Sequence, residues 1–76
     1  NAVAPGAVDT DLLQASLDDP ELGPVTEAFP IPVGRRGPVD DIAEAVWFVL
    51  AEAPFMVGSV VFVDGGSDAL MRPDLV

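Results

Sequence analysis

The spacing of hydrophobic positions changes along the chain, and each spacing predicts a different element. Residues 1–4, which are apolar from Ala2 onward, end at Pro5 and Gly6, which is typical of a strand that enters a forced turn. We expect Gly6 to supply a backbone conformation that is closed to other residues. From Thr10 onward three leucines recur at helical spacing, so we predict a helix with Thr10 as a candidate N-cap.

The second half of the chain is predicted to hold a longer helix and a strand. Trp47 and Phe48 lie outside an apolar stripe that residues 40–51 carry at helical spacing: Ile42, Ala45, Val46, Val49 and Leu50. We therefore expect this helix to be covered on more than one side. Residues 58–63 form a continuous β-branched and aromatic run, which predicts a strand covered on both faces.

The middle segment and the end of the chain are rich in residues that interrupt regular structure. Residues 18–34 contain four prolines and two glycines, so we predict a loop with a short helical piece around residues 25–29. A loop of this length in a compact domain is usually functional, for example as a lid. For residues 67–76 we predict one helical turn that stops at Pro73.

The order of these elements predicts the fold class. A strand, a helix, a loop, a long helix and a second strand form a βαβ crossover, which is expected to be right-handed with parallel strands. Parallel strands need neighbouring strands and layers on both faces. We therefore predict an α/β fold that is the C-terminal part of a doubly wound parallel sheet.

Charge and missing residue types restrict the function further. A net charge of −10, from thirteen carboxylates and three arginines, opposes binding to nucleic acid or to an anionic membrane surface. The chain has no Cys, His, Tyr or Lys, so we assign it no catalytic and no metal-binding residue. No apolar stretch is long enough to span a membrane and no signal peptide is recognisable. The lack of cysteine favours a cytoplasmic location.

Three motifs carry a resemblance to a known family: NAVAPGAVDT, GRRGPVDDIAEAVWFVL and GSVVFVDGG. In this order and spacing they resemble the C-terminal third of the short-chain dehydrogenase/reductases, which are NAD(P)-dependent oxidoreductases with a Rossmann-type fold. The resemblance implies that residues 1–76 are the C-terminal portion of a single NAD(P)-binding domain, with no second domain. It also implies that residues 11–34 are the substrate-binding flap. The helix entry departs from the family pattern, because Pro38 directly follows Gly37.

The resemblance assigns a cofactor site to the turn after the first strand. Pro5 and Gly6 match the pair that turns the chain beneath the nicotinamide. The backbone of Val8 and the hydroxyl of Thr10 match groups that bond the carboxamide or a neighbouring phosphate. The implied cofactor is NAD or NADP, with NAD favoured. A plain strand-to-helix turn with Thr10 as its N-cap is the alternative, and Thr10 can serve both roles.

Apolar residues of the flap and of the long helix receive further assignments. Four flap residues are candidates for a wall that binds a hydrophobic carbonyl or alcohol, such as a steroid or an aromatic compound: Leu12, Leu13, Leu17 and Phe29. The alternative is that these residues only pack the flap onto the body of the protein. By the same resemblance we expect Trp47, Phe48 and Val61 at the interface of a homodimer or homotetramer.

The two arginines before the long helix have several possible roles. We expect Arg35 and Arg36 to pair with the acidic residues that begin this helix, Asp40 or Asp41, or to lie at an interface. Phosphate binding is the alternative.

The resemblance also implies which chemistry lies outside these residues. The family's catalytic Ser and its Tyr-x-x-x-Lys pair would precede Asn1, which matches a structural strand residue and not the family's catalytic asparagine. Asp9 and Asp11 are expected to be turn and cap residues, not a catalytic pair. We therefore expect the complete protein to transfer a hydride between a nicotinamide and a carbonyl or secondary alcohol.

Two expectations concern the chain as a whole. The 76 residues alone should be inactive and should need the upstream part of their domain. A non-catalytic split subunit or interaction module of the same fold is the alternative function. The ending GGSDALMRPDLV resembles that of bacterial 3α-hydroxysteroid dehydrogenase/carbonyl reductases and of coniferyl-alcohol dehydrogenase-like members.

Overall fold

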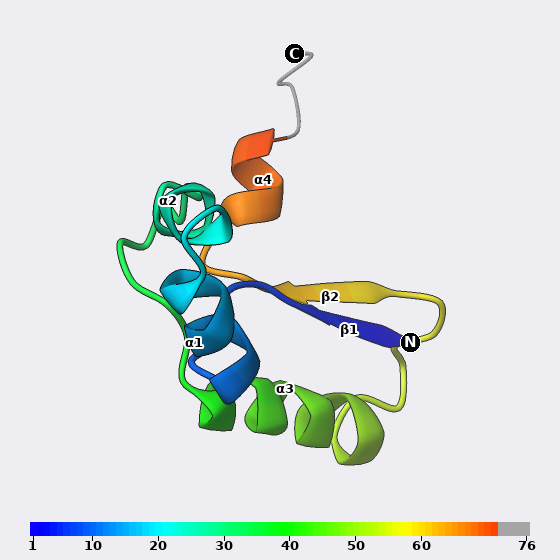
Figure 1. The fold of residues 1–76 in the computed structure, drawn as a ribbon. Helices are drawn as coiled ribbons and strands as arrows, with labels where there is room; N and C mark the ends of the chain where they lie inside the picture. The colour runs from blue at the N-terminus through cyan, green and yellow to red at the C-terminus, as the bar shows by residue number, and fades with distance from the viewer. Residues whose placement is uncertain (72–76) are drawn as a thin grey trace.

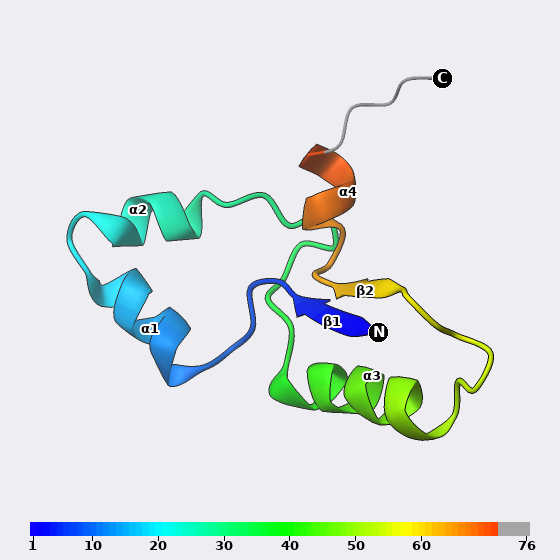
Figure 2. The same cartoon turned by 90° about the vertical axis from the view of Figure 1, so that its right-hand side faces the viewer.

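The structure, a computed structural model, describes residues 1–71 as a two-stranded sheet with four helices (Figures 1 and 2). In chain order the elements are β1 (Ala2–Pro5), α1 (Asp11–Asp18), α2 (Leu22–Glu27), α3 (Val39–Ala51), β2 (Val60–Val63) and α4 (Ser67–Met71). The predicted stop at Pro73 lies outside the described residues. In this part of the chain, no helix is both long enough and apolar enough to cross a membrane.

The two strands pair in parallel, as the element order predicted. Residues Ala2–Pro5 lie opposite Val60–Val63 in an unbroken register. The side chain of Asn1 fixes the start of this pairing, because its Nδ2 donates to the carbonyl of Met56 at 2.8 Å and its Oδ1 accepts the N–H of Ser59 at 2.9 Å. Helix α3 runs beneath the sheet and connects the strands, while α1 and α2 extend to the side (Figure 2).

Two boundaries differ slightly from the predicted ones. The second strand begins at Val60 instead of residue 58, because Gly58 takes a φ of 77°, a left-handed conformation incompatible with a strand. Helix α3 begins at Val39 directly after Pro38, whose φ of −73° and ψ of 152° are extended. The unusual helix entry therefore leaves the helix intact, and Asp40 lies in its first turn.

The predicted loop contains a complete short helix, α2. The helical piece expected around residues 25–29 is shifted, because a local cap starts the helix earlier. The carboxylate of Asp19 accepts the N–H groups of Glu21 and Leu22 at 2.8 and 2.9 Å. Pro24 stands in the first turn, where a proline removes no intrahelical hydrogen bond. The prolines that predicted a loop are therefore compatible with this helix.

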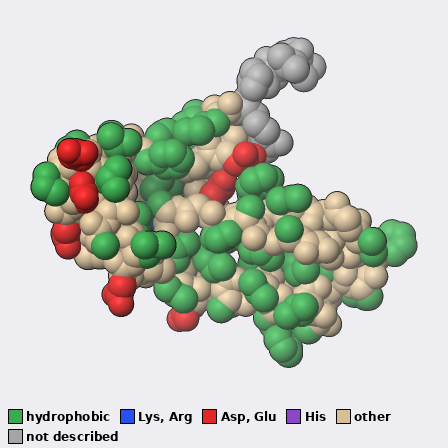
Figure 3. Space-filling model, turned by 45° about the vertical axis from the view of Figure 1, so that its right-hand side comes forward, with side chains coloured by type: hydrophobic (Ala, Val, Ile, Leu, Met, Phe, Trp, Pro, Cys, Tyr) green, Lys and Arg blue, Asp and Glu red, His purple; other side chains and the backbone are tan. Residues whose placement is uncertain are grey.

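Apolar packing between α3 and the sheet is incomplete within the described residues. The side chains of α3 that are half-buried against the sheet lie on one face: Ile42, Ala45 and Val49. Leu50 belongs to the predicted stripe but is 78% exposed, and Trp47 is 63% exposed. Among residues 1–71 no hydrophobic side chain is fully buried. On the face shown in Figure 3, apolar side chains spread over much of the surface and carboxylates gather mainly at one end.

Candidate functional site

The turn after β1 passes very close to the end of β2. The N–H of Gly6 donates to the carbonyl of Val63 at 3.0 Å. A Cβ at Gly6 would lie 2.6 Å from the Cβ of Asp64 and 2.7 Å from its Cα. Glycine is thus required here by the close approach of two backbones. The expectation of a special backbone conformation at Gly6 is wrong, because the described glycines with positive φ are at other positions: Gly34, Gly58, Gly65 and Gly66.

The chain continues past Gly6 as a short extended segment that pairs with the residue before α3. Gly37 donates its N–H to the carbonyl of Ala7 and accepts the N–H of Asp9, both at 2.9 Å. In such a parallel bridge the N–H and C=O of the central residue, Val8, point away from the paired segment. Among residues 1–71 neither group makes a hydrogen bond. The turn therefore offers one backbone donor and one backbone acceptor at Val8.

Thr10 begins α1, as predicted for an N-cap. Its backbone is extended, with φ −130° and ψ 165°, and its Oγ1 accepts the N–H of Leu13 at 3.2 Å. This bond uses an acceptor lone pair of the hydroxyl, so the hydroxyl proton stays available for donation to another group. The geometry of Thr10 is compatible with both the capping role and a second role in binding.

An open pocket of about 360 Å³ lies against this turn. The residues that line it are Pro5, Gly6, Ala7, Val8, Thr10, Leu12, Leu13 and Ser16. The structure thus brings all four predicted cofactor residues together with two of the predicted substrate residues. Leu12 is 81% exposed, so its side chain offers apolar surface.

The other two predicted substrate residues lie beside this pocket and not in it. Leu17 lines a neighbouring hollow with Thr10 and Gln14 on α1. Phe29, 44% exposed, lines a hollow of about 260 Å³ that also contains Pro5 and Gly6. Each of these two residues therefore shares a hollow with at least one predicted cofactor residue.

A polar contact that the sequence did not reveal holds the end of the predicted flap. Ser67 is 5% exposed, and its Oγ donates to the carbonyl of Pro30 at 2.7 Å. The N–H of Val33 donates to the carbonyl of Gly65 at 3.0 Å. A Cβ at Gly65 would lie 2.7 Å from Cγ2 of Ile31, so this glycine also permits a close approach. Nothing in the sequence identified the segment against which residues 64–67 pack.

The two arginines lie differently from the prediction. Arg36 pairs with Asp9 at 3.0 Å and with Glu27 at 4.0 Å, and not with the acidic residues at the start of α3. The expected pairing is therefore wrong for Arg36, because its side chain extends back toward the turn and α2. Asp9, predicted as a turn residue, follows the bridge residue Val8 on the extended segment and forms the ion pair with Arg36.

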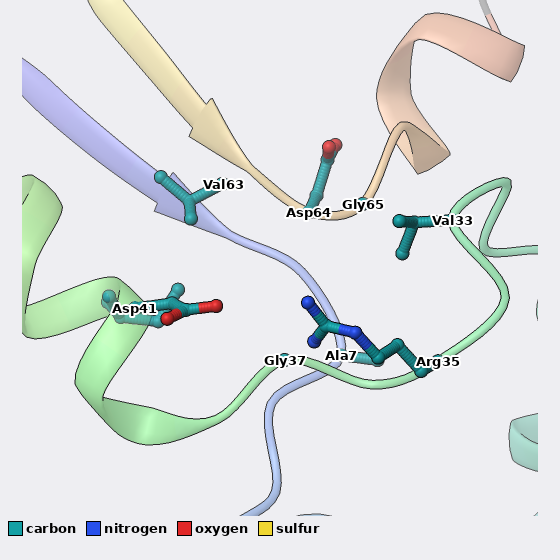
Figure 4. Close-up of a pocket in the computed structure, with 9 residues that line it drawn as sticks. Ala7, Val33, Arg35, Gly37, Asp41, Val63, Asp64 and Gly65 are labelled. Atoms are coloured by element: carbon teal, nitrogen blue, oxygen red, sulfur yellow. The ribbon is translucent and has the colours of Figure 1, made fainter.

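Arg35 extends into a separate small pocket of about 120 Å³ (Figure 4). Its side chain runs back past Gly37 and Ala7, toward the side on which Asp41 lies. Arg35 donates to the carbonyl of Arg36 at 3.3 Å. Within residues 1–71 Arg35 has no carboxylate within 4 Å, so the expected ion pair is absent there as well.

Comparison with known proteins relates this arrangement to oxidoreductases. A family model described as enoyl-(acyl carrier protein) reductase matches residues 1–68. The chain is 43% identical over 74 residues to 3-alpha-hydroxysteroid dehydrogenase/carbonyl reductase of Comamonas testosteroni, which covers 96% of this chain and 29% of that protein. It is 40% identical over 67 residues to glucose 1-dehydrogenase of Gluconobacter oxydans, which covers 87% of this chain and 25% of that protein.

A solved structure shows the same architecture. The crystal structure of 3-alpha-hydroxysteroid dehydrogenase from Pseudomonas sp. B-0831 complexed with NADH matches with a TM-score of 0.86 and 56% identity, covering 92% of this chain and 28% of that one. This chain therefore spans less than a third of the proteins it matches. The fold is that of a Rossmann-type oxidoreductase, with its turn at the carboxyl edge of a parallel sheet. The chain belongs to the short-chain dehydrogenase/reductase family, near its 3α-hydroxysteroid dehydrogenase/carbonyl reductase group.

Proposed function

We propose that the complete protein transfers a hydride between a nicotinamide cofactor and a carbonyl or secondary alcohol. In this proposal residues 1–76 are the C-terminal portion of one Rossmann-type domain, and residues 11–34 are its substrate flap. The observation that carries the proposal is the outward-facing backbone of Val8 beside the Thr10 hydroxyl. A carboxamide has one acceptor oxygen and a donor NH₂ group, which complement the N–H and C=O of Val8.

The residues of the turn fit such a group. The Val8 N–H and C=O would hold the carboxamide, and the hydroxyl proton of Thr10 would be donated to it or to a neighbouring phosphate. Pro5 and Gly6 would form the floor against which the ring lies, since both line the same pocket. The cofactor supplies or accepts the hydride when bound. This chain's own residues would fix which face of the ring meets the substrate.

We propose NAD as the cofactor, which is supported by the NADH in the related crystal structure. For the substrate we propose a hydrophobic carbonyl or alcohol such as a steroid or an aromatic compound. Exposed apolar side chains beside the turn support this class, Leu12 and Phe29 above all. The names of the relatives include both a steroid and a sugar dehydrogenase, so membership of the family alone does not define the substrate class.

Variants of Thr10 in the complete protein test the proposal. Thr10→Val removes both the cap and the hydroxyl proton, whereas Thr10→Asn keeps a capping oxygen and places its donor differently. Loss of one hydrogen bond weakens NADH binding by roughly two- to tenfold in both variants. Loss of the cap lowers the free energy of unfolding by about 1 kcal/mol in Thr10→Val only.

Thr10→Ser serves as the matched control, because it retains both functions of the hydroxyl. Titration of NADH fluorescence and urea unfolding measure the two effects separately. If NADH binds equally well to all four proteins, Thr10 is only a cap. If the complete wild-type protein binds no nicotinamide, the proposed function itself is wrong.

We also propose that the outer face of α3 joins copies of the protein. Trp47 and Phe48 are 63% and 45% exposed and line one broad hollow on this helix, which also contains Glu52. Val61 is half-buried and lies on the same face of β2 as Val63, which borders α3. Val61 would therefore contribute little surface to the interface. For the location of the protein we propose the cytoplasm, which the lack of cysteine supports.

A further inference from the structure

Arg36 connects the extended segment that carries the proposed nicotinamide site to helix α2. Its Nε donates to Oδ1 of Asp9 at 3.0 Å, across 27 positions of sequence. Its NH1 lies 4.0 Å from Oε2 of Glu27, the last residue of α2. A guanidinium presents several donors in one rigid plane, so a single side chain can face two carboxylates at once.

The two carboxylates belong to parts of the molecule that differ in how firmly they are held. Asp9 is fixed by its own N–H, which donates to the carbonyl of Gly37 at 2.9 Å. Glu27 ends a six-residue helix, α2, which packs mainly against α1 and not against the sheet or α3. Arg36 therefore joins a firmly held turn to a lightly held helix.

We propose that Arg36 is a positioning residue that ties α2 of the flap to the nicotinamide-side turn and so sets the closed position of the flap. This inference rests on the proposed function for its effect on the substrate, while the tie between Arg36 and Glu27 can be tested without any ligand. The longer separation, to Glu27, is the one that opens when the flap moves away. Arg36 stays on Asp9 during this motion.

The exposure of the three side chains fits a tie that opens and closes. The side chain of Arg36 is 38% exposed, that of Asp9 62% and that of Glu27 71%. Ion pairs this open to water are weak and sensitive to salt. Loss of the tie is therefore expected to change a binding constant by about two- to fivefold, and not to unfold the protein.

The experiment uses the complete protein and the variants Arg36→Met, Glu27→Gln and Arg35→Met. Hydrogen exchange of the amides of residues 22–27, without ligand, reports the opening of α2. We expect faster exchange in Arg36→Met and in Glu27→Gln, and no change in the matched control Arg35→Met. Arg36→Lys should restore part of the protection. The double variant Arg36→Met/Glu27→Gln should exchange its α2 amides no faster than Arg36→Met alone.

Steady-state kinetics then separate positioning from a structural role. KM for the carbonyl substrate should rise about two- to fivefold in Arg36→Met and in Glu27→Gln, with kcat nearly unchanged. In Glu27→Gln the dissociation constant for NADH should stay that of the wild type. The difference between wild type and variant should shrink as salt is raised from about 0.01 M to about 1 M, which shortens the Debye length from roughly 30 Å to 3 Å.

Unchanged exchange in α2 for both variants overturns the tie. Faster exchange with an unchanged KM overturns the positioning role. If the complete protein binds no nicotinamide, the proposed function fails while the exchange result still decides whether the tie exists.

Discussion

Replacement of Gly6 by alanine tests the close approach between the turn after β1 and the end of β2. The added Cβ would lie 2.6 Å from the Cβ of Asp64, whereas ordinary van der Waals contact begins at 3.4 Å. The obstacle at 2.7 Å is a backbone atom, the Cα of Asp64, so no side-chain rotation can remove it. The two strand ends must therefore separate by roughly 0.8 Å, and the bond from the Gly6 N–H to the Val63 carbonyl must lengthen.

The size of the effect follows from these contacts. Overpacking costs about 1–3 kcal/mol, and a weakened backbone hydrogen bond adds about 0.5–1.5 kcal/mol. Alanine also restricts the unfolded chain, which offsets about 0.4–1 kcal/mol. The net loss of stability is thus about 0.5–4 kcal/mol. The factor of about 2–4 °C per kcal/mol that holds for proteins of about 150–250 residues gives a fall in Tm of roughly 1–16 °C.

Gly37→Ala is the matched control, because the nearest atom to its added Cβ is the carbonyl oxygen of Ala7 at 3.9 Å. Both variants are made in the complete protein and compared by urea unfolding and by titration with NADH. We expect Gly37→Ala to stay within about 0.5 kcal/mol of the wild type. Gly6→Ala should lose both stability and affinity for NADH, because the displaced turn carries Val8. A stability of Gly6→Ala equal to that of Gly37→Ala would refute the reasoning from close approach.

Two other predictions concern the flap and the outer face of α3. The N–H groups of Leu22 and Glu21 hold the pKa of the Asp19 carboxyl below its ordinary value of 3.8. The ionised carboxylate therefore stabilises α2 fully above pH 3.8, and this stabilisation is lost as the pH falls through the lower pKa of the folded protein. Hydrogen exchange in α2, corrected for its intrinsic pH dependence, should therefore be faster in Asp19→Ala than in the wild type at neutral pH. In acid the exchange rates of the two proteins should become equal. A difference in rate that persists at low pH contradicts this prediction. Trp47→Asp or Phe48→Asp in the complete protein should shift the assembly to smaller species, because a charge replaces exposed apolar surface. Light scattering measures the mass of the assembly, and an unchanged mass in both variants contradicts the interface.

The elements that could be predicted from the sequence are those with strong local patterns. The run of β-branched residues before Asp64 predicted β2, and the apolar spacing after Asp40 predicted α3 to within a residue. Parallel pairing followed from their order alone. Thr10 as a cap was predictable because its role involves a backbone group only three residues away.

The features that sequence reasoning missed depend on contacts between distant segments. Gly6 is required by the close approach of Asp64, which is 58 positions later in the chain. The expectation that a special backbone conformation requires this glycine was therefore wrong. Arg36 pairs with Asp9, although Asp40 and Asp41 are much nearer in sequence. Helix α2 was shifted because its start depends on one side chain, Asp19, amid prolines that are typical of loops.

The side chain of Asn1 makes the sheet dependent on one amide group. Its Nδ2 and Oδ1 meet the carbonyl of Met56 and the N–H of Ser59, so the site needs a donor and an acceptor on the same side chain. Deamidation to aspartate would keep the acceptor but would place a second oxygen against the Met56 carbonyl, with no proton between them. Deamidation of this single residue would thus weaken the attachment of the loop before β2 to the start of β1, where the pairing of the two strands begins.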